Sequence, residues 1–224
     1  MNYFSAISYY FNSLITLFKY TEFWKIPLLF IRKPLLFSIN NKGKKHTFYV
    51  DRFMDIWVLK ELLLDKQYNY YGKAKKKWNV VDVGVGIGEF AIMLSQGVNH
   101  VYAFDPDENR FLLSEKNIKL HNVKNITLIG EPVKVIDDVF SEFKLNKCDL
   151  LKIDCEGCEY SVLLNSNPNI LKKIDRIIME AHLFTPVMKT KYIKLKKLLT
   201  DNGFKIIENN NPVHNYLKFV YAYK

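Results

Sequence analysis

The chain has 224 residues, of which 49% are hydrophobic and 25% are charged. This balance is typical of a globular protein and excludes disordered, collagen-like and low-complexity chains, and the length suits one α/β domain with an extension. The 33 Lys and Arg residues against 23 Asp and Glu residues give a net charge of +10. That charge fits a phosphate-rich or anionic-membrane partner, or a general composition bias, because the lysines are scattered along the chain.

The first 45 residues are predicted to form an amphipathic helical extension of a main domain that spans residues 46–224. One helix face is apolar at three- and four-residue spacing, with polar residues opposite, and it contains Phe4, Ile7, Phe11, Leu14, Ile15 and Phe18. A second apolar stretch, residues 23–31, is followed by Arg32 and Lys33. We expect this extension to pack on the domain or to lie in a membrane interface.

The composition of this apolar run and of the residues on either side of it indicates the cellular location of the protein. No basic segment precedes the apolar run and no small-residue cleavage site follows it, so no secretory signal is predicted. A membrane span needs about 20 mostly apolar residues, whereas this run is interrupted by Ser5, Ser8, Asn12, Ser13 and Thr16. We expect a cytoplasmic protein, with peripheral contact of the extension with the inner face of the membrane left open.

The remaining chain reads as alternating strands and helices. Residues 40–45 form a polar, turn-forming break that marks the predicted boundary of the extension, and residues 55–64 are predicted to be helical. Strands are predicted at residues 79–83, 100–105, 126–129, 149–154, 176–180, 204–208 and 217–223, and helices at residues 89–96, 108–121 and 189–201. This alternation predicts a doubly wound, parallel α/β sheet. The last two strands lack a crossover helix and are predicted to be antiparallel to each other.

Three cysteines, Cys148, Cys155 and Cys158, are too few for a disulfide framework. Cys155 and Cys158 form a C-x-x-C pair, but no second pair completes a structural zinc site. They lie in an apolar segment, where cysteine usually acts as a small hydrophobic residue. We therefore expect neither a redox nor a metal role for the pair, and a reducing compartment.

The strongest local motif is the glycine-rich stretch that follows the first predicted strand of the main domain. Asp82 lies within the strand, and Gly84, Gly86 and Gly88 follow at every second position, directly before a helix. Glycines at such a turn let a ligand approach the backbone near a helix N-terminus. Two cofactors compete for this motif. Gly86, Gly88 and Ala91, with an acid at Asp105, satisfy the relaxed dinucleotide fingerprint G-x-G-x-x-A.

The other interpretation is a resemblance. The acid-plus-glycine arrangement is similar to motif I of the class I S-adenosylmethionine-dependent methyltransferases. In that class the glycine loop contacts the amino acid end of the cofactor, and an acid on the second strand binds the ribose hydroxyls. By this resemblance Asp82, Gly84, Gly86, Gly88 and Asp105 are the cofactor-binding residues, and the fold is a seven-stranded, Rossmann-like sheet with an antiparallel C-terminal strand.

Four segments, in order and spacing, resemble the FkbM family of these methyltransferases. They are residues 80–90, residues 102–109 with Asn117, residues 151–159 and residues 177–182, and the D-x-E-G-x-E element of residues 154–159 is the most specific. The resemblance implies S-adenosylmethionine as cofactor and O-methylation of a sugar, glycan, glycolipid or secondary-metabolite hydroxyl. It also places the turn that contains Glu131 where the adenine would lie. Asp105 stands where a Glu is more usual, and cysteines fill apolar positions of the acidic motif.

The candidate catalytic residues are Asp154, Glu156, Glu180 and His182. They lie at or just past the carboxyl ends of two adjacent predicted strands, where ligands bind in open α/β sheets. Methyl transfer to a hydroxyl needs alignment of the reacting groups and removal of a proton. Neutral His182 is the predicted base, with Glu180 or Asp154 orienting it.

Several alternatives stay open from the sequence. Glu156 and Glu159 can cap the following helix, and His182 can be a packed histidine. Asp154, Glu180 and His182 can hold a divalent cation, although no metal is predicted. An RNA methyltransferase or RNA-binding protein fits the positive charge, but no Lys/Arg stripe interleaved with aromatic residues is present, so no specific nucleic acid is expected. A non-catalytic membrane-recruitment module is a further alternative.

Overall fold

The computed structural model describes residues 3–31, 33–66, 72–211 and 213–224. Its centre is a seven-stranded sheet with the order β5-β4-β3-β6-β7-β9-β8. The strands are β3 Asn79–Val83, β4 His100–Phe104, β5 Ile126–Ile129, β6 Leu150–Ile153, β7 Arg176–His182, β8 Lys205–Asn210 and β9 Leu217–Tyr223. The first five are parallel, whereas β9 is antiparallel to both β7 and β8. The predicted fold class is confirmed.

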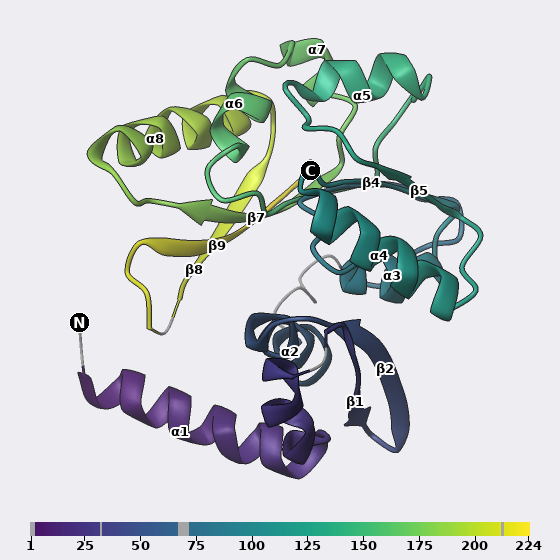
Figure 1. Cartoon of the computed structure of the whole chain (residues 1–224). Coiled ribbons are helices and arrows are strands. Elements are labelled where there is room, and N and C mark those ends of the chain that lie inside the picture. Colours follow the sequence, from purple (N-terminus) through teal and green to yellow (C-terminus); the bar gives the residue numbers. More distant parts are fainter. Residues whose placement is uncertain (1–2, 32, 67–71, 212) are drawn as a thin grey trace.

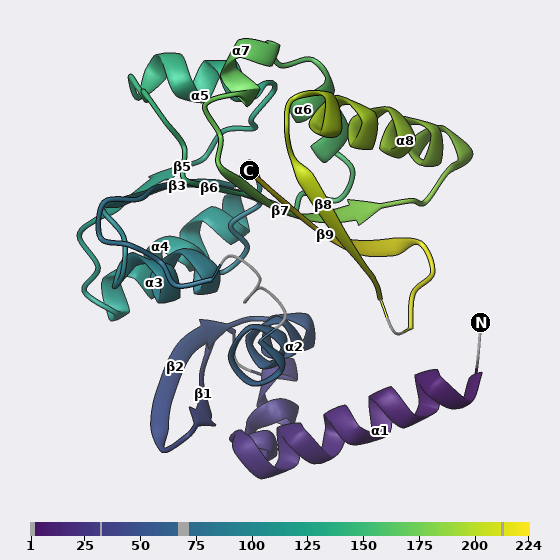
Figure 2. The ribbon, with the colours of Figure 1, turned by 180° about the vertical axis from the view of Figure 1, so that it is seen from behind.

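Helices cover both faces of this sheet (Figures 1 and 2). One face is covered by α3 Glu89–Ser95 and α4 Glu108–Leu120, and the other by α5 Ile136–Glu142, α6 Glu159–Leu164, α7 Pro168–Leu171 and α8 Pro186–Asp201. The strands consequently consist of nearly continuous apolar residues, as expected for a sheet that is buried on both sides. Two buried clusters of apolar side chains fill the layers above and below the sheet.

Several predicted element bounds differ from the structure, and two of the differences have a clear local cause. The strand predicted to end at residue 180 continues to His182, because β9 pairs with β7 along its whole length up to His182 opposite Leu217. The helix predicted from residue 189 begins at Pro186, because the Thr185 side chain accepts a hydrogen bond from the Met188 amide and proline suits the first helical position.

The N-terminal region contains α1 Tyr3–Tyr20, the 3₁₀ helix η1 Phe23–Phe30, β1 Leu35–Asn41, β2 Lys44–Val50, α2 Phe53–Lys60 and the π-helical turn η2 Glu61–Asp65. The strands β1 and β2 form an antiparallel hairpin. The predicted break at residues 40–45 is therefore a hairpin turn, and the extension, expected to be helical, includes a strand.

The hairpin packs on the main domain. Phe37 and Phe48 are fully buried in one cluster with Ile92 of α3 and Leu113 of α4. In the same layer the Asn117 side chain accepts a hydrogen bond from the Tyr49 amide and donates to two carbonyl oxygens, those of Tyr49 and Ile87. The hairpin is thus fixed directly to the glycine loop, and no boundary between separate cores falls at residue 45.

The helix α1 extends as an arm along one side of the molecule (Figure 1). Among the residues that the structure describes, no helix combines the length and apolar character that crossing a bilayer requires. The predicted apolar face of α1 faces outward from Ile7 to Phe18, so, of the two alternatives left open by the sequence, packing of this face on the domain is not seen among the described residues. Arg32 and the side chain of Phe4 lie outside the described residues.

Candidate active site

A pocket of about 420 Å³ lies at the carboxyl ends of β3, β4 and β6. The glycine loop, Asp105 and Asp154 form its floor, and the N-terminal region contributes its other wall through Arg52, Met54, Asp55 and Val58. This position agrees with the rule that ligands of open α/β sheets bind beyond the carboxyl ends of the strands. The N-terminal region is therefore part of the site.

Close packing explains two of the predicted glycines. A Cβ atom at Gly84 would lie 1.7 Å from the carbonyl oxygen of Asp154, so any side chain would separate the ends of β3 and β6. At Gly88, φ is +86° and a Cβ atom would lie 3.3 Å from Ser114 of α4, so this glycine starts α3 in close contact with α4. Of these two glycines, Gly84 lines the pocket and Gly88 does not.

Asp105 follows β4 and is oriented by the backbone. Its Oδ2 accepts a hydrogen bond of 3.0 Å from the Gly86 amide and its Oδ1 accepts one of 3.1 Å from the Asp107 amide. Burial raises the pKa of its carboxyl group, and these two amide donors oppose that shift. The structure thus connects the predicted second-strand acid to the glycine loop.

A buried lysine that sequence reasoning missed, Lys152, connects the strands and the glycine loop at the floor of the pocket. The Lys152 ammonium on β6 lies 3.0 Å from Asp82 Oδ1 and donates to the Gly84 carbonyl oxygen at 3.0 Å. Burial alone would lower its pKa, but the carboxylates of Asp82, Asp154 and Glu89 outweigh burial and raise it. Lys152 therefore stays charged. Asp82 pairs with the Lys152 ammonium, which in turn holds the Gly84 carbonyl oxygen of the glycine loop.

Glu89, at the start of α3, is the second residue that the sequence analysis missed. It lines the pocket, its side chain is buried, and its Oε2 has no hydrogen-bond partner within the part of the chain that the structure describes. Burial raises its pKa to about 7. A buried acceptor without a partner is costly, and a ligand that carries positive charge would supply one. The residues present therefore fit S-adenosylmethionine, which has an ammonium and a sulfonium group.

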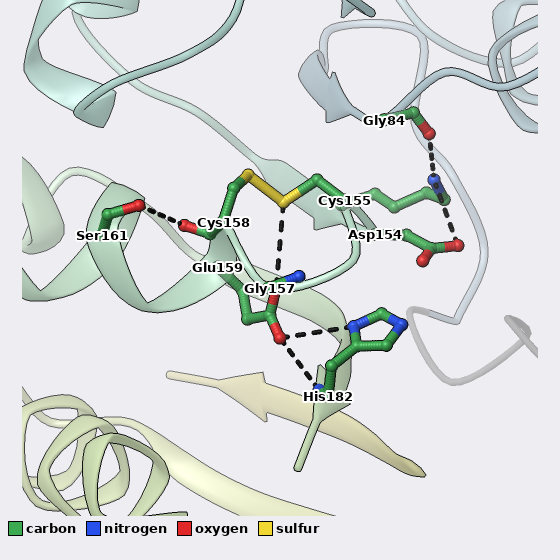
Figure 3. Close-up of a disulfide and its surroundings, with 9 residues drawn as sticks. Gly84, Asp154, Cys155, Gly157, Cys158, Glu159, Ser161 and His182 are labelled. Carbon is green, nitrogen blue, oxygen red and sulfur yellow. Dashed lines mark hydrogen bonds and ion pairs between the residues drawn. A yellow bond between two sulfur atoms is a disulfide. The ribbon is translucent and has the colours of Figure 1, made fainter. Parts of the chain in front are cut away.

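The imidazole of His182 is held by a carboxylate that the sequence analysis assigned only to helix capping. Glu159 Oε1 accepts a 2.8 Å hydrogen bond from the His182 amide and lies 3.3 Å from His182 Nδ1, and Glu159 Oε2 accepts one from the Gly157 amide (Figure 3). Burial would lower the pKa of His182, but Glu159 first, then Glu180 and Asp154, raise it. With Nδ1 facing Glu159, the ring leaves Nε2 for another partner.

The four predicted catalytic residues are brought together only in part. Asp154 and the exposed Glu156 line the pocket. Glu180 and His182 lie beside Asp154 without lining it, with Glu180 Oε1 4.0 Å from His182 Nε2. Burial, and next the Asp154 carboxylate, raise the pKa of Glu180 to about 8. Glu159, which contacts both the amide and Nδ1 of His182, is the carboxylate that orients the ring.

The cysteine expectation is wrong for the C-x-x-C pair. Cys155 and Cys158 form a disulfide across the loop that joins β6 to α6 (Figure 3), whereas Cys148 is a buried free cysteine, as expected for a small apolar residue. The disulfide spans Glu156 and Gly157, both of which have positive φ. Spacing alone did not reveal it, because the loop conformation decides whether the two sulfur atoms meet.

Two further expectations concern the edges of the site. Glu131, expected near the adenine, is exposed and does not line the pocket. No cluster of three or more His, Cys, Asp or Glu side chains suited to a metal ion occurs in the described ranges.

Part of the chain and its fold are similar to known methyltransferases. Residues 115–206 match the Methyltransferase FkbM domain, and no curated protein matches the chain. A putative methyltransferase from Streptococcus mutans, solved in complex with SAH, has a TM-score of 0.57 at 16% identity and covers 71% of this chain and 95% of its own. An rRNA methylase from Streptococcus thermophilus has a TM-score of 0.55 at 14% identity, with 73% and 95% covered.

A third solved structure, Trm5b from Pyrococcus abyssi, has a TM-score of 0.54 at 16% identity and covers 86% of this chain and 56% of its own. At such identities these likenesses show a shared fold, and they leave the methyl acceptor open. The FkbM match over residues 115–206 confirms the resemblance that the motifs carried over that part of the chain. Together with the seven-stranded fold, it supports an S-adenosylmethionine-dependent methyltransferase.

Proposed function

We propose that the protein methylates a hydroxyl group of a sugar, glycan, glycolipid or secondary metabolite. The observation that carries this proposal is the Glu159–His182 pair beside Asp154, at the carboxyl ends of β6 and β7. A hydroxyl is a poor nucleophile until its proton is removed, and an oriented imidazole is suited to that removal.

Different residues of the pocket would bind different parts of the cofactor. Asp105, fixed by the Gly86 and Asp107 amides, would accept hydrogen bonds from the ribose hydroxyls, and Glu89 would pair with the ammonium group of the cofactor. Lys152 keeps the glycine loop against β6 through the Gly84 carbonyl oxygen. When bound, S-adenosylmethionine supplies an electrophilic methyl group on a positively charged sulfur.

Proton removal falls to His182. Glu159 accepts a hydrogen bond from Nδ1–H, so the lone pair of the neutral ring lies on Nε2, which can accept the hydroxyl proton. The imidazolium formed in this way is stabilised by Glu159, as in other acid–histidine pairs. Asp154, which lines the pocket next to these groups, would help to orient the acceptor.

The acceptor class can be tested with labelled S-adenosylmethionine and separate fractions of host glycan, glycolipid and RNA. We expect label in a glycan, glycolipid or small-metabolite fraction, and alkali-stable label would indicate an ether rather than an ester. Incorporation into RNA alone would overturn the proposal in favour of the RNA alternative. The carboxylates at the pocket, Asp105, Asp154 and Glu156, would repel a phosphate backbone.

A further inference from the structure

The helix α1 binds the rest of the protein through a narrow polar stripe. Ser13 is buried and its hydroxyl accepts a 2.8 Å hydrogen bond from the buried Lys60 ammonium, and the Tyr9 hydroxyl donates to Glu61 Oε1 at 3.0 Å. The Tyr9 ring lies 6.0 Å from that of Trp57. Leu17 joins the stripe as its one fully buried large apolar residue among those described. The helix α1 therefore contacts the domain without using its apolar face.

That apolar face lies on a different side of the same helix. At 3.6 residues per turn its centre is roughly a third of a turn from the buried stripe. The face comprises Ile7, Phe11, Leu14, Ile15 and Phe18, and all five are exposed, with Phe18 at 74% and Phe11 at 63%. A polar stripe with Ser8, Asn12 and Lys19 completes the circumference. Burying these five side chains would be favourable, because each removes a large apolar surface from water.

The exposed apolar surface continues onto η1. The Phe18 ring lies 5.9 Å from the Phe23 ring. Beyond Phe23, four large apolar side chains are exposed, and the three most exposed are Trp24 at 70%, Phe30 at 90% and Ile31 at 85%. We call these three residues and the five of α1 the arm surface. An apolar surface of this extent is rare on a monomer and marks an interaction site.

The charges beside the arm surface select its partner. Residues 1–33 contain four basic residues, Lys19, Lys25, Arg32 and Lys33, and a single acid, Glu22. Glu22 is paired with Lys25 at 2.8 Å and with Lys45 at 3.5 Å, so the exposed Lys19 and Lys33 leave the surroundings positive. Aromatic and aliphatic side chains flanked by lysines match an anionic bilayer interface. A second copy would instead bring like charges together.

We propose that the arm surface docks the enzyme on the interface of an anionic lipid bilayer, with the apolar face of α1 in the headgroup region. The proposal concerns where the protein sits and does not depend on the acceptor of the methyl group. It would place the sheet and its pocket next to molecules that are presented at the membrane surface.

Vesicle flotation of the full chain tests the proposal. The probes are vesicles of phosphatidylcholine alone and of phosphatidylcholine mixed with phosphatidylglycerol. We expect the protein to float with the mixed vesicles, to float less at high salt because exposed charges are screened, and to stay at the bottom with phosphatidylcholine alone. The double variant Phe11→Gln/Phe18→Gln should bind the mixed vesicles more than tenfold more weakly, because two aromatic side chains no longer enter the interface.

The matched control is Ile193→Gln/Ile207→Gln, which changes two exposed apolar residues outside the arm surface, on α8 and β8. This variant should bind like the wild type. All variants should melt within a few degrees of the wild type, since the changed side chains are exposed. Absence of flotation by the wild type, or equal flotation of the arm variant, would overturn the proposal. A dimer in sedimentation equilibrium that dissociates in the arm variant would identify a second copy as the occupant.

Discussion

The central sheet and the N-terminal arm use burial in opposite ways. In the sheet, apolar strands are covered on both faces and the buried polar groups include ionisable ones: Lys152 and Asp82 under the glycine loop, and Glu159 beside His182. In the arm, the buried contact is polar and the apolar residues face outward. Burial of charge tunes pKa values for chemistry, whereas an exposed apolar face is free for a partner. We therefore expect chemistry and localisation to be separable by mutation.

The largest effect should come from His182→Ala. We expect kcat to fall by about 10²–10⁴, the range for a lost general base, while the thermal shift given by S-adenosylhomocysteine and vesicle flotation stay unchanged. Turnover assays beside thermal melts measure both. The arm variant Phe11→Gln/Phe18→Gln is the reciprocal control, because it should keep wild-type turnover on a soluble acceptor. A His182→Ala protein that turns over normally would transfer the role of base to Glu180, Asp154 or a bound metal.

Asp105→Ala should act on cofactor binding. Loss of a hydrogen bond to a charged acceptor costs about 1.5–3 kcal/mol, which corresponds to about 10- to 100-fold in Kd. Isothermal titration with S-adenosylhomocysteine should show this loss, and the exposed neighbour Glu108→Ala should bind like the wild type. If NAD stabilises the wild-type protein and S-adenosylhomocysteine does not, the assignment of Asp105 to this cofactor is wrong.

Glu159→Gln should change the pH dependence of turnover. His182 works as a base in its neutral form, so kcat should rise with pH through the pKa of His182, which Glu159 holds above its usual value. The glutamine variant lacks that charge, and the acidic limb of its profile should move to lower pH while the plateau falls. Glu142→Gln, an exposed carboxylate on α5, is the control. A lower plateau with an unmoved limb would mean that Glu159 only supports the fold.

The smallest effect should appear in the stability of Glu89→Gln. Burial raises the Glu89 pKa from 4.5 to about 7 in the folded state. The unfolded chain therefore loses this proton at lower pH than the folded chain, and the stability of the wild type falls as pH rises from about 4.5 to 7. Without ligand, the variant should melt above the wild type at pH 8, with a gap that closes toward pH 5.

Added S-adenosylhomocysteine should narrow the advantage of Glu89→Gln, because only the wild-type carboxylate can pair with an ammonium group. The same melts carried out with ligand measure this change. An equal ligand-induced shift in both proteins would remove Glu89 from the binding residues.

The sequence by itself determined the sheet and the glycine loop at its edge. Strands buried on both sides are continuous apolar runs, and a glycine turn between a strand and a helix is a local pattern, so Asp82, Gly84, Gly86 and Gly88 could be placed at this turn from the adjacent sequence. Asp105 followed from its place at the end of the next strand, and His182 from its place near the end of another. Each assignment needed only short-range information.

Only the tertiary structure decided which groups meet across these elements. Glu159 and His182 are 23 residues apart, and Lys152 and Asp82 are 70 residues apart, so no local pattern pairs them. The Cys155–Cys158 bond depends on the conformation of a loop. The apolar period of α1 indicated an amphipathic helix but not its orientation, because the Ser13–Lys60 contact outcompetes the apolar face for the protein surface. Periodicity gives the faces of a helix, and the partner available to each face decides which one is buried.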